Sequence, residues 1–145
     1  MTRWIVSGPA ALLLAACGGP AEVTVEDAWV RLPASPGRPG AGYLTIHGGA
    51  TDRTVVRITA DYALRSEMHE TMSGGGHMSM RPLASVPVPA GKDVTFTPGG
   101  RHLMLYGLDA RAKPGTSTLL TLTFENGQRI YRKAYIIGPG DPAPE

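Results

Sequence analysis

Residues 116–137 read TSTLLTLTFENGQRIYRKAYII and carry the clearest structural signal in the chain. Apolar and polar residues alternate on both sides of Asn126-Gly127, as they do in half-buried β-strands. The Asn-Gly dipeptide is the strongest short-range signal for a tight hairpin. We therefore predict two antiparallel strands, over 116–124 and 128–137.

The rest of the chain repeats this pattern of short strands between turns. It has 19 Gly and 13 Pro among 145 residues, with short β-branched runs between them. This composition is typical of an all-β sandwich or barrel, and the length suits a single domain. Besides the two hairpin strands, the sequence predicts strands over 22–31, 42–47, 53–59, 64–70, 77–83, 93–97 and 101–107.

The N-terminal segment has the composition of a secretory signal peptide. Arg3 supplies a positive charge, and an apolar run follows that is too short to cross a membrane as a helix. The run ends in Leu14-Ala15-Ala16-Cys17, which resembles a bacterial lipobox, where the Cys becomes the first mature residue and carries lipid. The alternative is a plain signal peptide that is cut nearby, with Cys17 incidental.

The lipobox predicts the organisation of the whole chain. Residues 1–16 would be a lipoprotein-type signal peptide, and 17–22 a tether that begins at lipidated Cys17. Residues 23–137 would be the folded domain, and the Pro-rich segment 138–145 a disordered tail. We therefore expect the protein in the periplasm or cell envelope, anchored to a membrane through its lipid, and monomeric.

Charge and cysteine usage exclude some function classes. The chain has 14 Lys+Arg against 12 Asp+Glu, a net charge of +2, and the charges are dispersed. This balance argues against nucleic acid as a partner. Cys17 is the only Cys, so the folded domain can have neither an internal disulfide nor the thiolate of a blue-copper electron carrier.

Methionine and histidine gather in one part of the sequence. All five Met residues other than Met1 fall between Met68 and Met104, and so do three of the four His residues. A core that used Met only as filler would scatter it over every strand. Thioether sulfur and imidazole nitrogen together suit monovalent copper better than zinc, magnesium or calcium.

Strand alternation indicates which of these side chains face outward. Within 101–107, His102 and Met104 share one face and the two leucines that flank Met104 share the other. The leucines are the natural core residues, so we predict that His102 and Met104 form a pair on the exposed face. In 64–70, alternation favours His69 as a ligand and Met68 as a core residue. Alternation cannot choose between Met78 and Met80.

The spacing of these residues matches a known motif. Ten residues separate His69 from Met80, and twenty-one separate Met80 from His102-Leu103-Met104. This spacing resembles the H(M)x₁₀Mx₂₁HxM motif of the PCu(A)C periplasmic copper chaperones. The resemblance extends over about 23–137. It includes Ala28-Trp29-Val30-Arg31, Met80-Arg81-Pro82, Pro89-Ala90-Gly91 and Pro98-Gly99-Gly100-Arg101.

The resemblance implies a fold and a ligand set. The fold would be a cupredoxin-like Greek-key β-sandwich with one exposed Cu(I) site, whose ligands are His69, Met80, His102 and Met104. This implication, and not strand geometry, favours Met80 over Met78. The nearby Met72, His77 and Met78 are either auxiliary copper ligands or loop residues without a role. A second, Cu(II) site is not expected, because 138–145 has no His and no Met.

The resemblance also implies a function. The protein would be a copper chaperone that delivers Cu(I) to the copper centres of cytochrome c oxidase. Its partners would be a Sco-like thioredoxin-fold protein or oxidase subunit II. One alternative is an envelope copper buffer that delivers to no enzyme, and another is a metal-free adhesive or structural lipoprotein. No enzyme activity is expected, since the chain has neither a Gly-x-Ser-x-Gly elbow nor a paired-carboxylate pattern.

Overall fold

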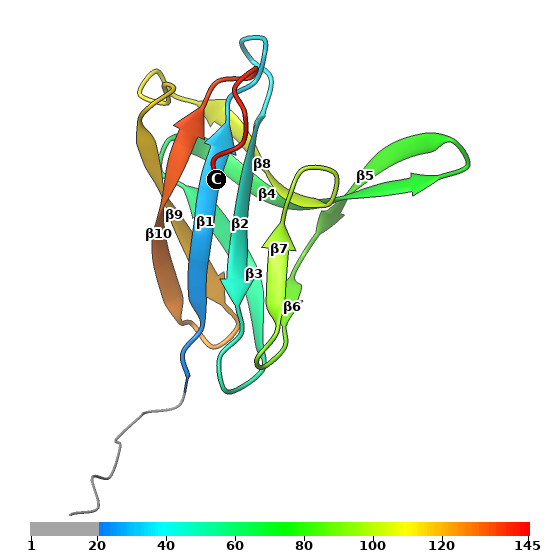
Figure 1. Cartoon of the computed structure of the whole chain (residues 1–145), viewed down its shortest axis with the longest axis vertical. Coiled ribbons are helices and arrows are strands. Elements are labelled where there is room, and N and C mark those ends of the chain that lie inside the picture. The colour runs from blue at the N-terminus through cyan, green and yellow to red at the C-terminus, as the bar shows by residue number, and fades with distance from the viewer. Residues whose placement is uncertain (1–20) are drawn as a thin grey trace, which may run out of the picture.

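The computed structural model describes residues 21–145, which form ten β-strands (Figure 1). The prediction of an all-β chain is confirmed. In this range no helix is long and apolar enough to cross a membrane. In chain order the strands are β1 (Thr24–Arg31), β2 (Gly40–His47), β3 (Arg53–Ala60), β4 (Ala63–Gly74), β5 (His77–Leu83), β6 (Val86–Val88), β7 (Asp93–Phe96), β8 (Arg101–Leu108), β9 (Ser117–Phe124) and β10 (Arg129–Ile137).

The signal peptide predicted over 1–16 and the lipidation predicted at Cys17 lie outside the described residues. The tether predicted over 17–22 falls inside them only at its last two residues.

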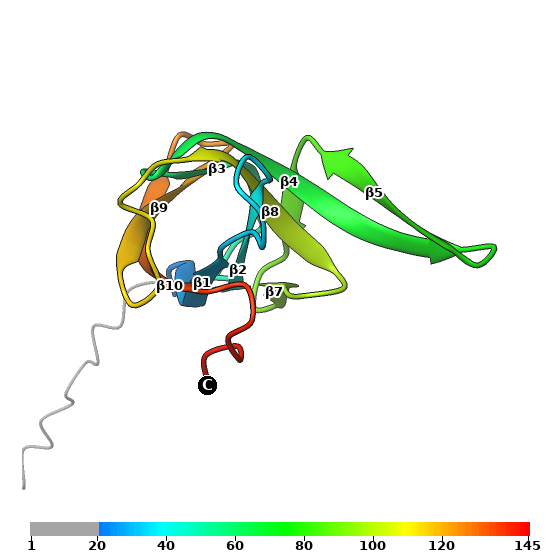
Figure 2. The ribbon, with the colours of Figure 1, turned by 90° about the horizontal axis from the view of Figure 1, so that it is seen from above.

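All ten strands belong to one sheet. The hydrogen-bonded order is β5-β4-β8-β2-β1-β10-β9-β3-β6, and β7 also pairs with β2. The sheet curls until β3 lies against β4, so that an end-on view shows a ring of strands (Figure 2). The first and last strands, β1 and β10, run parallel to each other. The two layers of the predicted sandwich are therefore parts of a single curled sheet.

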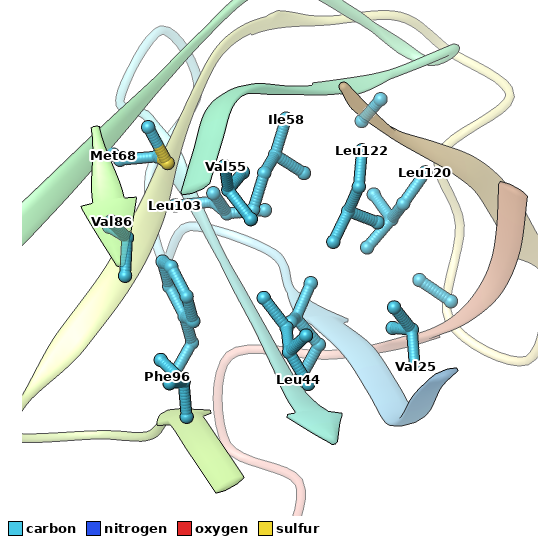
Figure 3. Packing of buried hydrophobic residues seen from close by; sticks show 14 of the residues in the cluster. Val25, Leu44, Val55, Ile58, Met68, Val86, Phe96, Leu103, Leu120 and Leu122 are labelled. Carbon is cyan, nitrogen blue, oxygen red and sulfur yellow. The ribbon is translucent and has the colours of Figure 1, made fainter. Parts of the chain in front are cut away.

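The core lies inside this ring. Alternate residues of the strands point inward, and Figure 3 shows how their side chains meet. Full burial of one such aliphatic side chain is worth about 1.5–3 kcal/mol. The largest fully buried side chains are Phe96, Phe124, Leu44, Ile46, Ile58, Leu103, Leu105, Leu120, Leu122, Ile136, Val30 and Val55.

The hairpin predicted around Asn126-Gly127 is present. The Phe124 N–H donates to the Gln128 carbonyl at 2.9 Å, and the Gly127 N–H donates back to the Phe124 carbonyl at 2.9 Å. Gly127 takes the left-handed conformation, with φ of 84°, which a residue without a Cβ adopts at no steric cost. The turn fixes the β9–β10 register, and with it the inward direction of Leu120 and Leu122.

Strands β4 and β5 form an arm that projects from the ring (Figures 1 and 2). The sequence predicts a strand that ends near residue 70 and a flexible link over 71–76. The structure differs, because β4 continues to Gly74 and only Gly75 and Gly76 form the turn. Both glycines have positive φ, 59° and 78°, as a tight two-residue hairpin turn requires. Residues 71–74 therefore pair with β5 and do not form a loop.

The start of the C-terminal segment, residues 138–141, lies against Arg31 of β1. The Arg31 guanidinium donates to the carbonyl oxygens of Gly138, Pro139 and Asp141 at 3.4, 3.3 and 2.6 Å. The Asp141 carboxylate in turn accepts the Gly138 N–H at 2.6 Å. One cation from β1 thus contacts three carbonyl oxygens of this segment.

Candidate metal centre

Three neighbouring strands bring the four predicted ligands together. Strand β4 lies between β8 and β5, and its His69 stands directly opposite His102 of β8. Met104 is two residues further along β8, on the same face as His102. Met80 of β5 stands opposite Thr71, which shares the His69 face of β4. All four side chains therefore belong to the outer face of this three-stranded part of the sheet.

The inner face of the same strands is core, as predicted. Leu103 and Leu105 are fully buried, and Met68 is 5% exposed. Met68 packs with the other core residues in Figure 3. Met68 and His69 face opposite sides of the sheet because successive side chains alternate along β4.

A pocket of about 410 Å³ opens over the outer face. Its walls come from four segments, namely β2, the β4–β5 arm, the turn before β8 and β8 itself. The Tyr43 ring forms part of the wall, and burial raises the pKa of its hydroxyl. The lining residues with sulfur or imidazole groups are Met78, Met80, His102 and Met104.

His102 is less accessible than the sequence indicates. Alternation places it on the outer face, yet it is only 5% exposed and Met104 is half-buried. The expected exposed pair is therefore a recessed one. The reason is the turn before β8, since Pro98 and Gly99 line the same pocket and the Gly100 carbonyl lies 3.2 Å from His102 Nδ1.

Each histidine uses one ring nitrogen for a hydrogen bond. The Gly100 carbonyl can only accept, so His102 Nδ1 must donate to it. His69 Nε2 lies 2.9 Å from Glu67 Oε2, and the carboxylate accepts that N–H. In the neutral ring the other nitrogen then carries a lone pair, namely Nε2 of His102 and Nδ1 of His69. An outer hydrogen bond that fixes the free nitrogen in this way is usual for metal-binding histidines.

Those two free nitrogens are buried and have no partner. In residues 21–145, His69 Nδ1 and His102 Nε2 are the buried side-chain polar atoms without a hydrogen bond. A buried polar atom left unpaired costs about 1–3 kcal/mol. A ligand that accepts both lone pairs would remove both costs at once.

The separation of the rings suits a shared ion. The His69 and His102 ring centroids are 6.0 Å apart, with 35° between the ring planes. For metal–nitrogen bonds of about 2.0 Å, two imidazoles on one ion have centroids roughly 5–6.4 Å apart. The unpartnered nitrogens and this separation of the rings are compatible with one metal ion bound between the two imidazoles.

Glu67 contacts the candidate ligand His69, and the sequence interpretation did not assign it a role. Besides His69, its carboxylate pairs with Arg65, whose guanidinium stacks on the Tyr106 ring at 4.1 Å from the centroid. The hydrogen bond from His69 and the charge of Arg65 hold the pKa of Glu67 below its usual value. The available signal was the Glu-x-His spacing, which places both side chains on one face of a strand.

The three auxiliary candidates separate onto two faces. Met78 is two residues from Met80 on β5 and lines the same pocket. Met72 follows Thr71 on β4 and so faces the opposite side of the arm. His77 precedes Met78 and also faces away. Of the three, only Met78 shares a face with the predicted ligands.

Comparisons with known proteins identify the family of the chain. The family described as putative lipoprotein LpqE-like matches residues 23–135. The putative lipoprotein Lxx21020 of Leifsonia xyli subsp. xyli (strain CTCB07) is 34% identical over 106 residues, which is 72% of this chain and 63% of the relative. The alignment thus spans less than two thirds of that relative.

Two solved structures share the fold. The copper-bound PCuAC domain from PmoF2 has a TM-score of 0.67 at 17% identity, covering 84% of this chain and 97% of that one. The solution structure of apo-DR1885 from Deinococcus radiodurans has a TM-score of 0.60 at 25% identity, covering 97% and 99%. The predicted cupredoxin-like fold and PCu(A)C resemblance are confirmed. The chain belongs to the LpqE-like family of putative lipoproteins and has the fold of the PCuAC domains.

Proposed function

We propose that this protein is a copper chaperone, which binds Cu(I) through His69, Met80, His102 and Met104 and passes it to a partner. The observation that carries the proposal is the pair of buried, unpartnered imidazole nitrogens, His69 Nδ1 and His102 Nε2. They lie on the same sheet face as two thioethers, and three of the four side chains line one pocket.

The donor set favours a soft, singly charged ion. Two thioethers and two neutral imidazoles carry no charge, so a monovalent cation leaves the smallest net charge to bury. Thioether sulfur selects Cu(I) over harder divalent ions. Glu67, one hydrogen bond behind His69, places a carboxylate near the ion without being one of the four ligands. Support also comes from the fold neighbour described as copper-bound.

The same donors suit transport better than catalysis. Hydrolysis with a metal needs a strong Lewis acid and a nucleophilic water, and thioether ligands lower Lewis acidity. Met80 is 58% exposed, so one ligand of the proposed site is within reach of an incoming donor. An ion held partly by an accessible thioether can leave by ligand exchange.

The cellular setting is part of the proposal. We place the folded domain at 23–137, and a lipid on Cys17 would hold it at the membrane surface in the periplasm. The description of the family as putative lipoproteins supports this anchor. The acceptor would be a Sco-like thioredoxin-fold protein or cytochrome c oxidase subunit II, in assembly of the oxidase copper centres. An envelope copper buffer would use the same site but would have no acceptor.

Replacing the thioethers should weaken copper binding. Met80→Leu and Met104→Leu keep the size of the side chain and remove the sulfur, so each should lower Cu(I) affinity by about tenfold or more. Titration against a competing Cu(I) chelator under reducing conditions measures this. Met68→Leu is the matched control, because Met68 adjoins His69 in sequence but faces the core, and it should bind copper like the wild type. If changing all four proposed ligands to Ala leaves the affinity unchanged, the site is wrong.

Removing the Glu67 carboxylate should also weaken binding, although Glu67 is not a proposed ligand. Glu67→Ala leaves His69 Nε2 without its acceptor, and loss of such an outer partner typically costs about 10–100-fold in metal affinity. Glu67→Gln keeps an oxygen that can accept the N–H and should lose less. The unfolding temperature of the copper-free variants serves as the control for a general structural effect. Wild-type affinity in Glu67→Ala would contradict the proposed role of the carboxylate.

A deletion strain separates delivery from buffering. If the protein delivers copper, the strain should lose cytochrome c oxidase activity and regain it when copper is added. Complementation with the Met80→Leu/Met104→Leu variant should fail at low copper. Normal oxidase activity together with increased copper sensitivity would instead identify the protein as a buffer.

A further inference from the structure

The β4–β5 arm has an anchored base and a free outer part. At the base, the Thr71 N–H donates to the Gly100 carbonyl at 3.1 Å, which joins the arm to the turn before β8. Glu70 forms an ion pair with Arg81 at 2.7 Å and approaches Arg101 of β8 at 3.9 Å. Pairing of β4 with β8 ends at Glu70, so beyond Thr71 the arm pairs only with itself.

Met80 lies at the anchored base of the arm, and Met78 lies on its free outer part. Met80 stands opposite Thr71, the last residue tied to the body, whereas Met78 stands opposite Ser73 on the free part. The two share one face of β5, and their Cα atoms are separated by about 6.6 Å along the strand. Both line the pocket that contains His102 and Met104.

The surroundings of Met78 differ from those of a core methionine. Met78 is 73% exposed, more than Met80, so it contributes little to packing. Its neighbours across the arm, Thr71 and Ser73, are small and leave room for long side chains on this face. Met78 is thus a soft, accessible donor on the solvent side of the four proposed ligands.

Met72 provides an internal comparison. It has the same side chain on the same arm and is 45% exposed, but it lies on the opposite face and does not line the pocket. Met72 and Met78 are therefore both exposed methionines of the arm. What distinguishes Met78 is that it faces the pocket.

We propose that Met78 is a transfer ligand, which holds Cu(I) transiently as the ion enters or leaves the site. This inference rests on the proposed function. In the exchange, a lone pair of Met78 Sδ forms a bond to Cu(I) while the bond from Met80 Sδ breaks. The ion stays Cu(I), no electron or proton moves, and a donor atom of the acceptor then displaces Met78. The resting site keeps the four ligands named above.

The test compares Met78→Leu with Met72→Leu in the copper-loaded protein under anaerobic, reducing conditions. Excess bicinchoninate is the acceptor, and its absorbance in a stopped-flow instrument gives the transfer rate. We expect Met78→Leu to slow transfer by about tenfold, because one stabilising contact is lost at the exchange step. Its equilibrium Cu(I) affinity should change much less than that of Met80→Leu. Met72→Leu should match the wild type in both rate and affinity.

Two results would overturn the inference. If Met78→Leu transfers copper as fast as Met72→Leu, Met78 has no role in transfer. If Met78→Leu weakens affinity as much as Met80→Leu does, Met78 is a resting ligand and not a transfer ligand. The first result leaves the proposed function intact, and the second would add Met78 to the resting ligands of the same site. The proposed function fails separately, if changing His69, Met80, His102 and Met104 to Ala leaves the Cu(I) affinity unchanged.

Discussion

The register between β4 and β8 is the constraint on which the rest of the site depends. It sets His69 opposite His102 and Glu67 opposite Met104, while Met68 and Leu103 face the core. Because side chains alternate along a strand, a one-residue slip of β4 against β8 would turn His69 inward and Met68 outward while His102 stayed on the outer face. Burial of the core residues therefore fixes the β4–β8 register, and this register places the proposed ligands on the outer face. The β4–β8 register thus determines both which side chains pack inside the ring and which side chains form the candidate site on its outer face.

The two unpaired imidazole nitrogens of the candidate site lower the stability of the metal-free fold. Two buried nitrogens lack partners in the protein alone, whereas buried polar groups are nearly always hydrogen-bonded. One nitrogen of each ring donates to a carboxylate or a backbone carbonyl, so neither ring can turn its free nitrogen toward a hydrogen-bond donor without losing that bond. The sheet thus pre-organises two donors, and in the proposed site the more exposed Met80 would supply a further donor from the arm. This combination of fixed imidazoles and an accessible thioether suits an ion that must be held and then released.

Much of the fold, and the placement of the proposed ligands on one face of the sheet, could be predicted from the sequence, because strand alternation and turn residues are local signals. Alternation identified Leu103 and Leu105 as core, Asn126-Gly127 identified the last hairpin, and the spacing from His69 to Met104 matched a motif. What could not be predicted depends on contacts distant in sequence. The turn before β8 buries His102, Arg31 donates to carbonyl oxygens of residues 138–141, and β4 extends past residue 70 because β5 pairs with it. Choosing Met78 over Met72 and His77 likewise needed the register of the arm.

X-ray absorption at the copper K edge of the Cu(I)-loaded protein tests the central claim most directly, since it counts sulfur and nitrogen ligands separately. We expect two sulfur and two nitrogen donors, as two thioethers and two imidazoles require. A first shell of nitrogen and oxygen only, without sulfur, would contradict the proposed site.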